Sequence, residues 1–404
     1  MMPQFRARHY RTLLPVDVII EGELIADISE ADCSAEELEQ LPYVSPGFFD
    51  IQINGYNGMW FSSPALTTDQ VVSVTEALVN KSVARYFPTL ITNSFAALHH
   101  GFSTLRQACD QNAIVNDCVA GYHLEGPYIS AEDGPRGAHP LQHVRAADYD
   151  EFEKLQAASG GRIRLVTLAA EVDNAVPFIQ QCTAKGVVVA LGHSAANTDQ
   201  IHEAVAAGAR LSTHLGNGAH AVLPRHPNYL WDQLADDNLW ASIIADGWHL
   251  PHSVLKCVLR CKSISKTILT CDVSGFGGCP PGTYAEGDVD VDVLDDGRIV
   301  VAGQRQFLAG SGSITGDCVV HIINTCGLSL HDAVRMATVN PARLFDEPLP
   351  EVEIGAVATL SLFRLCEFSE KSRVQPDGCG SLTFLPSGTF VRGESLMAPR
   401  SVDS

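Results

Sequence analysis

The sequence predicts an α/β protein built on a TIM-like (β/α)8 barrel, with a small β-sandwich domain formed from both chain termini. Short apolar segments alternate with longer helical stretches eight times between residues 48 and 272. This count, over about 230 residues, is typical of a (β/α)8 barrel. The segments before and after this region are strand-like, so the two ends of the chain are expected to form a separate sheet structure.

Strand-like patterns at the two ends predict the small domain. The stretch DVIIEGELIADIS, at 17–29, has two apolar runs separated by a Glu-Gly turn. The tail is again strand-like in EIGAVATLSLFRL and SGTFVRGE. Because isolated hairpins are marginally stable, we expect these ends to pair with each other. The predicted domains are 1–45 with 347–404, and the barrel at 46–346.

Eight apolar segments are the expected barrel strands. They are 48–53, 84–92, 119–124, 162–170, 186–193, 209–215, 240–246 and 266–272. Stretches between them, such as TTDQVVSVTEALVNKS and NTDQIHEAVAAGA, begin with Thr and Asp and have apolar residues at helical spacing, which predicts helices. After a Pro-Pro-Gly loop at 280–282, GDVDVDVLDDGRIVVAG predicts a hairpin. Helical patterns return at 315–345.

Composition and charge exclude several classes of protein. The 404 residues include 27 Lys or Arg and 47 Asp or Glu, a net charge of −20. This balance argues against binding nucleic acid or an anionic membrane, but it allows one small anionic ligand. No apolar run predicts a transmembrane helix, and no secretory signal is recognised. The twelve scattered cysteines lack a CxxC pair, which favours free thiols and a cytoplasmic location.

Polar residues follow most of the expected strands, where the chemistry of such barrels is found. They are Gln52, Asn54, His123, Glu125, His193, His214, Asp246, His249 and Asp272. Each alone could be a buried structural residue, but their shared placement indicates a site. Two imidazoles and one carboxylate, here His193, His214 and Glu125, are a known ligand set for one catalytic divalent metal. Asp272 could accept a proton from water on that metal.

Seven motifs in order carry a resemblance to a known family: PGFFDIQINGYNG, HLEGPYI, LGHS, THLGNGAH, IADGWHL, LTCDVSGFGGCPPGTY and LAGSGSITG. Together, over residues 44–345, they resemble the N-acetylglucosamine-6-phosphate deacetylase family of the amidohydrolase superfamily. The resemblance implies a metal-dependent hydrolase that converts N-acetylglucosamine 6-phosphate to glucosamine 6-phosphate and acetate. It also implies a small anionic sugar-phosphate substrate and a homodimer.

The resemblance assigns Glu125, His193 and His214 to one divalent metal per subunit. Many amidohydrolases bind a second metal through His-x-His on the first strand, but Gln52 and Asn54 match those positions here. Amides are poor ligands for zinc-like ions, so a single metal is expected. No lysine ends the strand in LVTLAAE, so a carbamylated-lysine bridge is not indicated. Zinc is favoured, with iron, cobalt or manganese as alternatives.

The resemblance also implies catalytic and substrate-binding residues. Asp272 matches the family's catalytic aspartate, and His139, in RGAH, matches a histidine that polarises the acetyl carbonyl. The substrate-binding positions are Asn217, Gly218, Ala219, Arg225, His249 and Leu308. Arg225 is the natural phosphate partner because a guanidinium forms paired hydrogen bonds to phosphate oxygens. In the family the matching arginine reaches the other subunit's site, whereas His220 and His226 depart from the family's pattern.

Other functions are weighed against this one. An amidohydrolase could act on a different N-acyl amino sugar or another amide, and a catalytically silent barrel could only bind a sugar phosphate. The presence of Asp272 favours an enzyme, and a scaffold protein gives no reason for polar residues at one face. The glycines of GSGSITG follow a late loop rather than a first strand, which argues against a dinucleotide-binding fold. No Gly-x-Ser-x-Gly elbow indicates a serine hydrolase.

Overall fold

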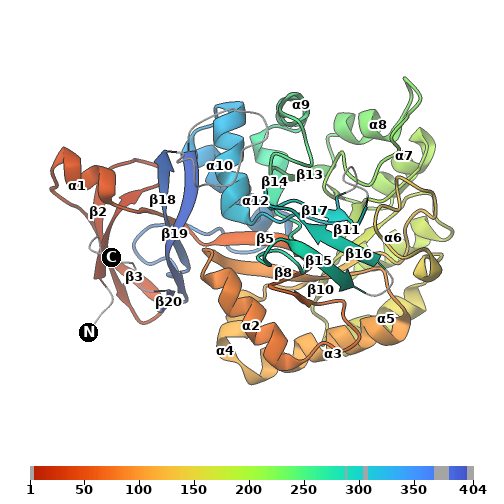
Figure 1. The fold of residues 1–404 in the computed structure, drawn as a ribbon, viewed down its shortest axis with the longest axis horizontal. Helices are drawn as coiled ribbons and strands as arrows, with labels where there is room; N and C mark the ends of the chain where they lie inside the picture. Colours follow the sequence, from red (N-terminus) through yellow and green to blue (C-terminus); the bar gives the residue numbers. More distant parts are fainter. Residues whose placement is uncertain (1–3, 287–288, 304–307, 368–381, 398–404) are drawn as a thin grey trace.

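A barrel of eight parallel strands lies at the centre of the computed structural model, which describes residues 4–286, 289–303, 308–367 and 382–397 (Figure 1). Its strands neighbour one another in chain order: β5 (Phe48–Ile53), β8 (Val83–Ile91), β9 (Tyr122–Glu125), β10 (Ile163–Leu168), β11 (Val188–Leu191), β12 (Leu211–Ser212), β13 (Trp240–Ile244) and β14 (Thr267–Thr270). A parallel bridge between Ile53 and Val273 brings the first strand beside the last. The predicted barrel is confirmed.

Helices follow the barrel strands, as their amphipathic patterns predict. They are α2 (Thr68–Val79), α3 (Phe95–Gln111), α4 (Ala113–Cys118), α5 (Tyr149–Ala158), α6 (Ala175–Ala184), α7 (Thr198–Ala206), α8 (Tyr229–Ala235) and α9 (His252–Lys262). Thr67, the N-cap residue before α2, forms a reciprocal capping box with Gln70. The cap of α7 is Asn197, which forms the same box with Gln200. Each box satisfies backbone N–H groups that a helix start leaves unpaired.

Strands from both termini form one mixed seven-stranded sheet beside the barrel (Figure 1). In spatial order they are β20 (Glu394–Met397), β19 (Leu382–Val391), β18 (Leu360–Glu367), β4 (Tyr43–Pro46), β1 (Gln4–His9), β2 (Pro15–Glu21) and β3 (Leu24–Glu30). The short helix α1 (Ala35–Gln40) precedes β4. β4 joins the two halves, because it pairs parallel with β1 and antiparallel with β18. The termini therefore meet as predicted, and the exact domain boundaries stay a prediction.

One residue, Gly47, separates β4 of the terminal sheet from β5 of the barrel. A Cβ atom at this position would lie 2.5 Å from the Ala84 side chain and 2.9 Å from that of Thr359. The close approach of the two neighbours therefore requires glycine here. The sheet and the barrel are joined at this point by extended chain.

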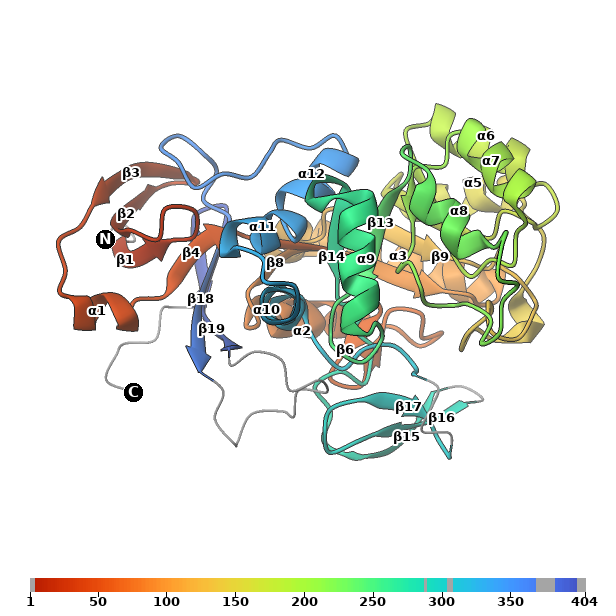
Figure 2. The ribbon, with the colours of Figure 1, turned by 90° about the horizontal axis from the view of Figure 1, so that it is seen from above.

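A small three-stranded sheet projects from the barrel after β14 (Figure 2). Its strands are β15 (Gly282–Glu286), β16 (Val289–Val293) and β17 (Ile299–Val301), and β16 and β17 form the predicted hairpin. β15 is an additional strand that begins at the end of the predicted Pro-Pro-Gly loop. The expected helices at 315–345 are α10 (Thr315–Cys326), α11 (Leu330–Met336) and α12 (Val339–Leu344).

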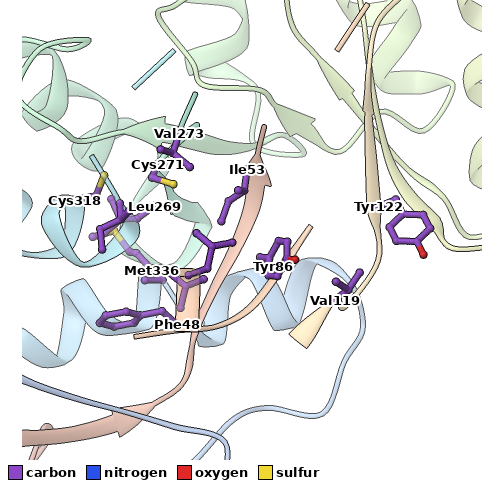
Figure 3. Packing of buried hydrophobic residues seen from close by; sticks show 14 of the residues in the cluster. Phe48, Ile53, Tyr86, Val119, Tyr122, Leu269, Cys271, Val273, Cys318 and Met336 are labelled. Carbon is purple, nitrogen blue, oxygen red and sulfur yellow. The ribbon is translucent and has the colours of Figure 1, made fainter. Parts of the chain in front are cut away.

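Apolar side chains fill both the barrel and its junction with the outer helices. Figure 3 shows Phe48 and Ile53 of β5, Leu269 of β14 and Met336 of α11, all members of the same buried cluster. A second cluster fills the amino-terminal end of the barrel, where the Phe345 ring packs 4.7 Å from that of Phe87. This packing leaves the opposite, carboxyl-terminal end for polar residues.

The structure can be compared with two expectations drawn from composition, free cysteine thiols and the absence of a transmembrane helix. The eleven cysteines in the described part of the chain are free thiols. Among those same residues, no helix is long and apolar enough to cross a membrane. The cytoplasmic location stays a prediction.

Candidate metal centre and active site

Three predicted ligand residues converge at the carboxyl ends of neighbouring barrel strands. Glu125 is the last residue of β9, and His193 and His214 follow β11 and β12. The Glu125 Oε1 lies 3.2 Å from His193 Nε2 and 3.0 Å from His214 Nε2, and the two Nε2 atoms are 3.1 Å apart. All three side chains are buried. The sequence therefore identified a real cluster.

This donor set fits a single divalent metal. Ligand atoms about 2.0–2.2 Å from a tetrahedral ion lie about 3.3–3.5 Å from one another, close to the spacing here. His193 Nδ1 lies 2.9 Å from the carbonyl oxygen of Pro135, which can only accept. The ring therefore carries a proton on Nδ1, and in its neutral form Nε2 presents a lone pair to the Glu125 carboxylate. A cation between these two groups would satisfy both of them.

The two histidines keep the Glu125 carboxylate ionised. Burial raises the pKa of Glu125, but hydrogen bonds and charge from His193 and His214 outweigh this effect and hold it well below its usual range. Burial lowers the pKa of His214, but the hydrogen bond and charge of Glu125 raise it above its usual value. Glu125 is therefore an ionised ligand suited to a divalent metal.

Asp272 stands beside the cluster and is held by two amide side chains. Its Oδ1 accepts hydrogen bonds from Asn54 Nδ2 at 2.8 Å and from Gln52 Nε2 at 3.0 Å. Gln52 Nε2 also donates to Glu125 Oε1 at 2.8 Å. Burial and the charge of Glu125 raise the pKa of Asp272 to about 6. Gln52 and Asn54 thus act here as donors that orient two carboxylates, and the single-metal interpretation stays a prediction.

Backbone geometry marks three of these positions as unusual. His193, His214 and Asp272 have φ angles of +52°, +28° and +49°, in the left-handed region that favours glycine. Each such residue costs about 1–3 kcal/mol and persists only where its surroundings impose it. The strain falls on two candidate ligands and on the candidate catalytic aspartate, which supports a functional role for this end of the barrel.

His139 lies against the cluster although it comes from a loop rich in proline and glycine. Its ring centroid is 4.2 Å from that of His193, and its Nδ1 is 2.8 Å from Thr92 Oγ1. Burial, reinforced by the neighbouring His193, lowers the pKa of His139 to about 3. The structure therefore brings this predicted residue to the site as a neutral imidazole.

His249 also reaches the site, from the turn that follows β13. Its Nδ1 lies 2.8 Å from Asp246 Oδ2. Burial lowers the pKa of His249, but the charge and hydrogen bond of Asp246 raise it above its usual value, with a further contribution from Asp272.

The predicted substrate-binding positions after His214 differ in burial and in their contacts with the cluster. The Asn217 N–H donates to the His214 carbonyl at 2.9 Å. A Cβ at Gly218 would lie 2.8 Å from His193 Nδ1, and its φ is +55°, so glycine is required. Ala219 is half-buried, whereas Arg225 is exposed in the loop before α8. The role of Arg225 at a partner's site stays a prediction.

His220 and His226, which depart from the family's pattern, differ in their contacts and exposure. His220 Nδ1 lies 3.0 Å from Tyr229 Oη, and its Nε2 lies 3.0 Å from Glu132 Oε2. It therefore connects the loop after His214 to the loop that carries His139. His226 is exposed.

Leu308 begins the segment that returns to the barrel before α10. It forms a bridge with Val300 of β17 and is half-buried. Three residues later, the Ser311 N–H donates to the Asp272 carbonyl at 3.0 Å. This places the predicted loop beside the candidate catalytic aspartate.

Three neighbours of the cluster were not predicted from the sequence. Thr92 contacts His139, and the Pro135 carbonyl accepts from the ligand His193. The Glu171 carboxylate accepts from Ser194 Oγ and the Ala195 N–H, both at 2.6 Å, and so holds the chain after His193. Thr92 is the last residue of one expected strand and Glu171 directly follows another. That position at a strand end could have identified both as candidate site residues. The contribution of a backbone carbonyl, such as that of Pro135, has no signal in the sequence.

Comparison with known proteins identifies the family. The amidohydrolase family model matches residues 43–394. The chain belongs to the amidohydrolase family. The N-acetylglucosamine-6-phosphate deacetylases of Bos taurus and Homo sapiens are each 33% identical to it, over 346 and 347 residues respectively. Both alignments cover 83% of this chain and 80% of the relative.

A solved structure and a further relative extend this similarity. A mutant of N-acetyl-D-glucosamine-6-phosphate deacetylase from Mycobacterium smegmatis, in complex with N-acetyl-D-glucosamine-6-phosphate, matches with a TM-score of 0.80 and 26% identity. The match covers 95% of both chains. The N-acetylgalactosamine-6-phosphate deacetylase of Escherichia coli O157:H7 is 28% identical over 325 residues, covering 80% of this chain and 84% of the relative. This amidohydrolase therefore shares its fold with an N-acetyl-D-glucosamine-6-phosphate deacetylase and is similar in sequence to deacetylases of two amino sugar phosphates.

Proposed function

We propose that this amidohydrolase removes the acetyl group of N-acetylglucosamine 6-phosphate, giving glucosamine 6-phosphate and acetate. The observation that carries the proposal is the convergence of Glu125, His193 and His214 next to Asp272 at the carboxyl end of the barrel. Relatives with this activity in their names cover most of the chain. The site contains both a metal-ligand set and a separate carboxylate that can move a proton.

The side chains have distinct roles in this proposal. A divalent metal bound by the three ligands would polarise the acetyl carbonyl and make water more acidic. The Asp272 carboxylate accepts the proton of the attacking water and delivers it to the leaving nitrogen. Gln52 and Asn54 hold that carboxylate in place. His139 donates a hydrogen bond to the acetyl oxygen as negative charge develops there.

The sugar phosphate is held by a second group of residues. His249 and the backbone N–H groups of Gly218 and Ala219 bind the sugar and its phosphate, because the Asn217 N–H already donates to the His214 carbonyl, and Leu308 lies near the acetyl group. Arg225 reaches the phosphate at the site of the other subunit in a homodimer, where its guanidinium forms paired hydrogen bonds. We favour one zinc ion per subunit and a cytoplasmic enzyme without nucleic-acid partners, in keeping with the acidic net charge.

The test is a deacetylation assay combined with metal analysis. Acetate and free amine are measured with N-acetylglucosamine 6-phosphate, N-acetylgalactosamine 6-phosphate and unphosphorylated N-acetylglucosamine. The first substrate is expected to react fastest. Equal rates with and without phosphate would contradict the phosphate role of Arg225, and faster reaction of the galactosamine sugar would reassign the substrate. Binding without acetate release would favour a silent sugar-phosphate-binding protein.

A further inference from the structure

Asp246, just beyond β13, is a buried carboxylate with no direct role in the proposed reaction. It is 8% exposed. Its Oδ1 accepts hydrogen bonds from the backbone N–H groups of Trp248 and His249, both at 2.9 Å. Its Oδ2 lies 2.8 Å from His249 Nδ1 and accepts from Ser311 Oγ at 3.0 Å. Both oxygens are therefore occupied by donors from its own turn and from a distant loop.

The contacts of Asp246 fix both the backbone and the ring of His249. Gly247 has a φ of +84°, which lets the chain turn so that the next two N–H groups point at Oδ1. The ring then donates its Nδ1–H to Oδ2, because a carboxylate can only accept. This hydrogen bond leaves Nε2, on the opposite edge of the ring, for a ligand.

The contact with Ser311 links the same carboxylate to the loop that begins at Leu308. Ser311 is buried, and its N–H donates to the Asp272 carbonyl at 3.0 Å. Its own carbonyl accepts from the Ser274 N–H at 2.9 Å. Asp246 therefore connects two segments that face the substrate in the proposed function.

We propose that Asp246 is a positioning residue for substrate binding, which fixes His249 so that Nε2 meets an oxygen of the sugar phosphate. This inference rests on the proposed function. An ionised carboxylate accepts all four hydrogen bonds, whereas an amide oxygen accepts only on one side. Asparagine at this position keeps the volume but turns an NH2 group toward one pair of donors. The ring of His249 and the side chain of Ser311 are the groups free to shift in response.

Steady-state kinetics of the metal-loaded enzyme test the proposal with a double-mutant cycle. Asp246→Asn is expected to raise KM for N-acetylglucosamine 6-phosphate about 10- to 100-fold with less than a threefold change in kcat, because a hydrogen bond to a charged group is lost from binding. His249→Asn is expected to do the same. Because Asp246 acts through His249, the double variant should resemble His249→Asn. Independent, multiplicative effects would overturn the proposal.

Matched variants separate this role from a general loss of structure. Asp17→Asn neutralises a half-buried carboxylate of the terminal sheet, which lies 2.8 Å from Arg6, and should leave KM unchanged. Ser311→Ala removes the loop contact with Asp246, together with the hydrogen bond that Ser311 Oγ accepts from the Ser313 N–H, and should have a smaller effect on KM than Asp246→Asn. If Asp246→Asn fails to fold, wild-type protein labelled with 15N-histidine still provides a test. Glucosamine 6-phosphate should then shift the Nε2 signal of His249, assigned by its loss in His249→Asn, and no shift would refute the proposal.

The outcomes distinguish this inference from the proposed function. If the wild-type enzyme releases no acetate from N-acetylglucosamine 6-phosphate, the proposed function fails. If the wild-type enzyme is active and KM is unchanged in both Asp246→Asn and His249→Asn, the positioning role fails and the function stands.

Discussion

Replacing Gln52 with leucine should weaken metal binding and slow the reaction at the same time. The Gln52 amide donates both to the ligand Glu125, at 2.8 Å, and to Asp272, at 3.0 Å. Loss of a hydrogen-bond partner of a metal ligand typically costs about 10- to 100-fold in metal affinity. Loss of a hydrogen bond to a charged group, here the one from Gln52 to Asp272, costs about 1.5–3 kcal/mol. We therefore expect kcat to decrease by roughly 10- to 150-fold.

A matched variant separates these two effects. Asn54 Nδ2 donates to Asp272 at 2.8 Å, the same carboxylate oxygen that Gln52 contacts. Asn54→Ala should therefore lower kcat while the metal affinity stays close to that of the wild type. Metal affinity is measured by competition with a chelator of known affinity, and kcat by acetate release at saturating metal. Unchanged metal affinity in Gln52→Leu, or an equal loss in both variants, would refute the reasoning.

Three further predictions follow from the structure. Gly218→Ala should lower metal affinity, measured by the same competition, because the new Cβ would press on His193 at 2.8 Å; wild-type affinity would contradict this. The raised pKa of His249 and the lowered pKa of Asp246 mean that the pair stabilises the fold fully between about pH 4 and pH 6.5, and less as the pH rises through the folded value of His249. Urea unfolding of the wild type and His249→Asn should therefore give a stability difference that shrinks with rising pH, whereas a constant difference would exclude this linkage. Asp50→Ala should lower the free energy of unfolding by about 2–4 kcal/mol, because four buried donors lose their acceptor, and an unaltered urea midpoint would argue against that role.

The barrel and its strand-end residues could be predicted because they follow from local pattern and topology. Each apolar segment indicates a strand, and parallel strands place their carboxyl ends at one rim. Glu125, His193, His214 and Asp272 therefore had to lie close together once the strands were correctly assigned. Their distances confirm this reasoning.

The partners of these residues could not be predicted in the same way. The contact between His193 and the Pro135 carbonyl depends on the path of a loop, and a carbonyl group carries no sequence signal. Asp246 and Ser311 are 65 residues apart, and their contact depends on where the chain re-enters the barrel before α10. In the proposed function, the phosphate contact of Arg225 requires a second subunit, whose position the pattern of one chain does not describe.

The single residue between β4 and β5 has a consequence for how this protein can be divided. β5 carries Gln52, and Asn54 follows it directly. This first strand of the barrel begins one residue after β4 of the terminal sheet ends. Gly47 leaves no space for a longer side chain, and its N–H donates to the Thr359 carbonyl at 2.9 Å. A barrel transplanted without the terminal sheet would lose the partner that fixes the start of its first strand. The terminal sheet and the barrel should therefore be transferred together when chimeras between relatives are designed.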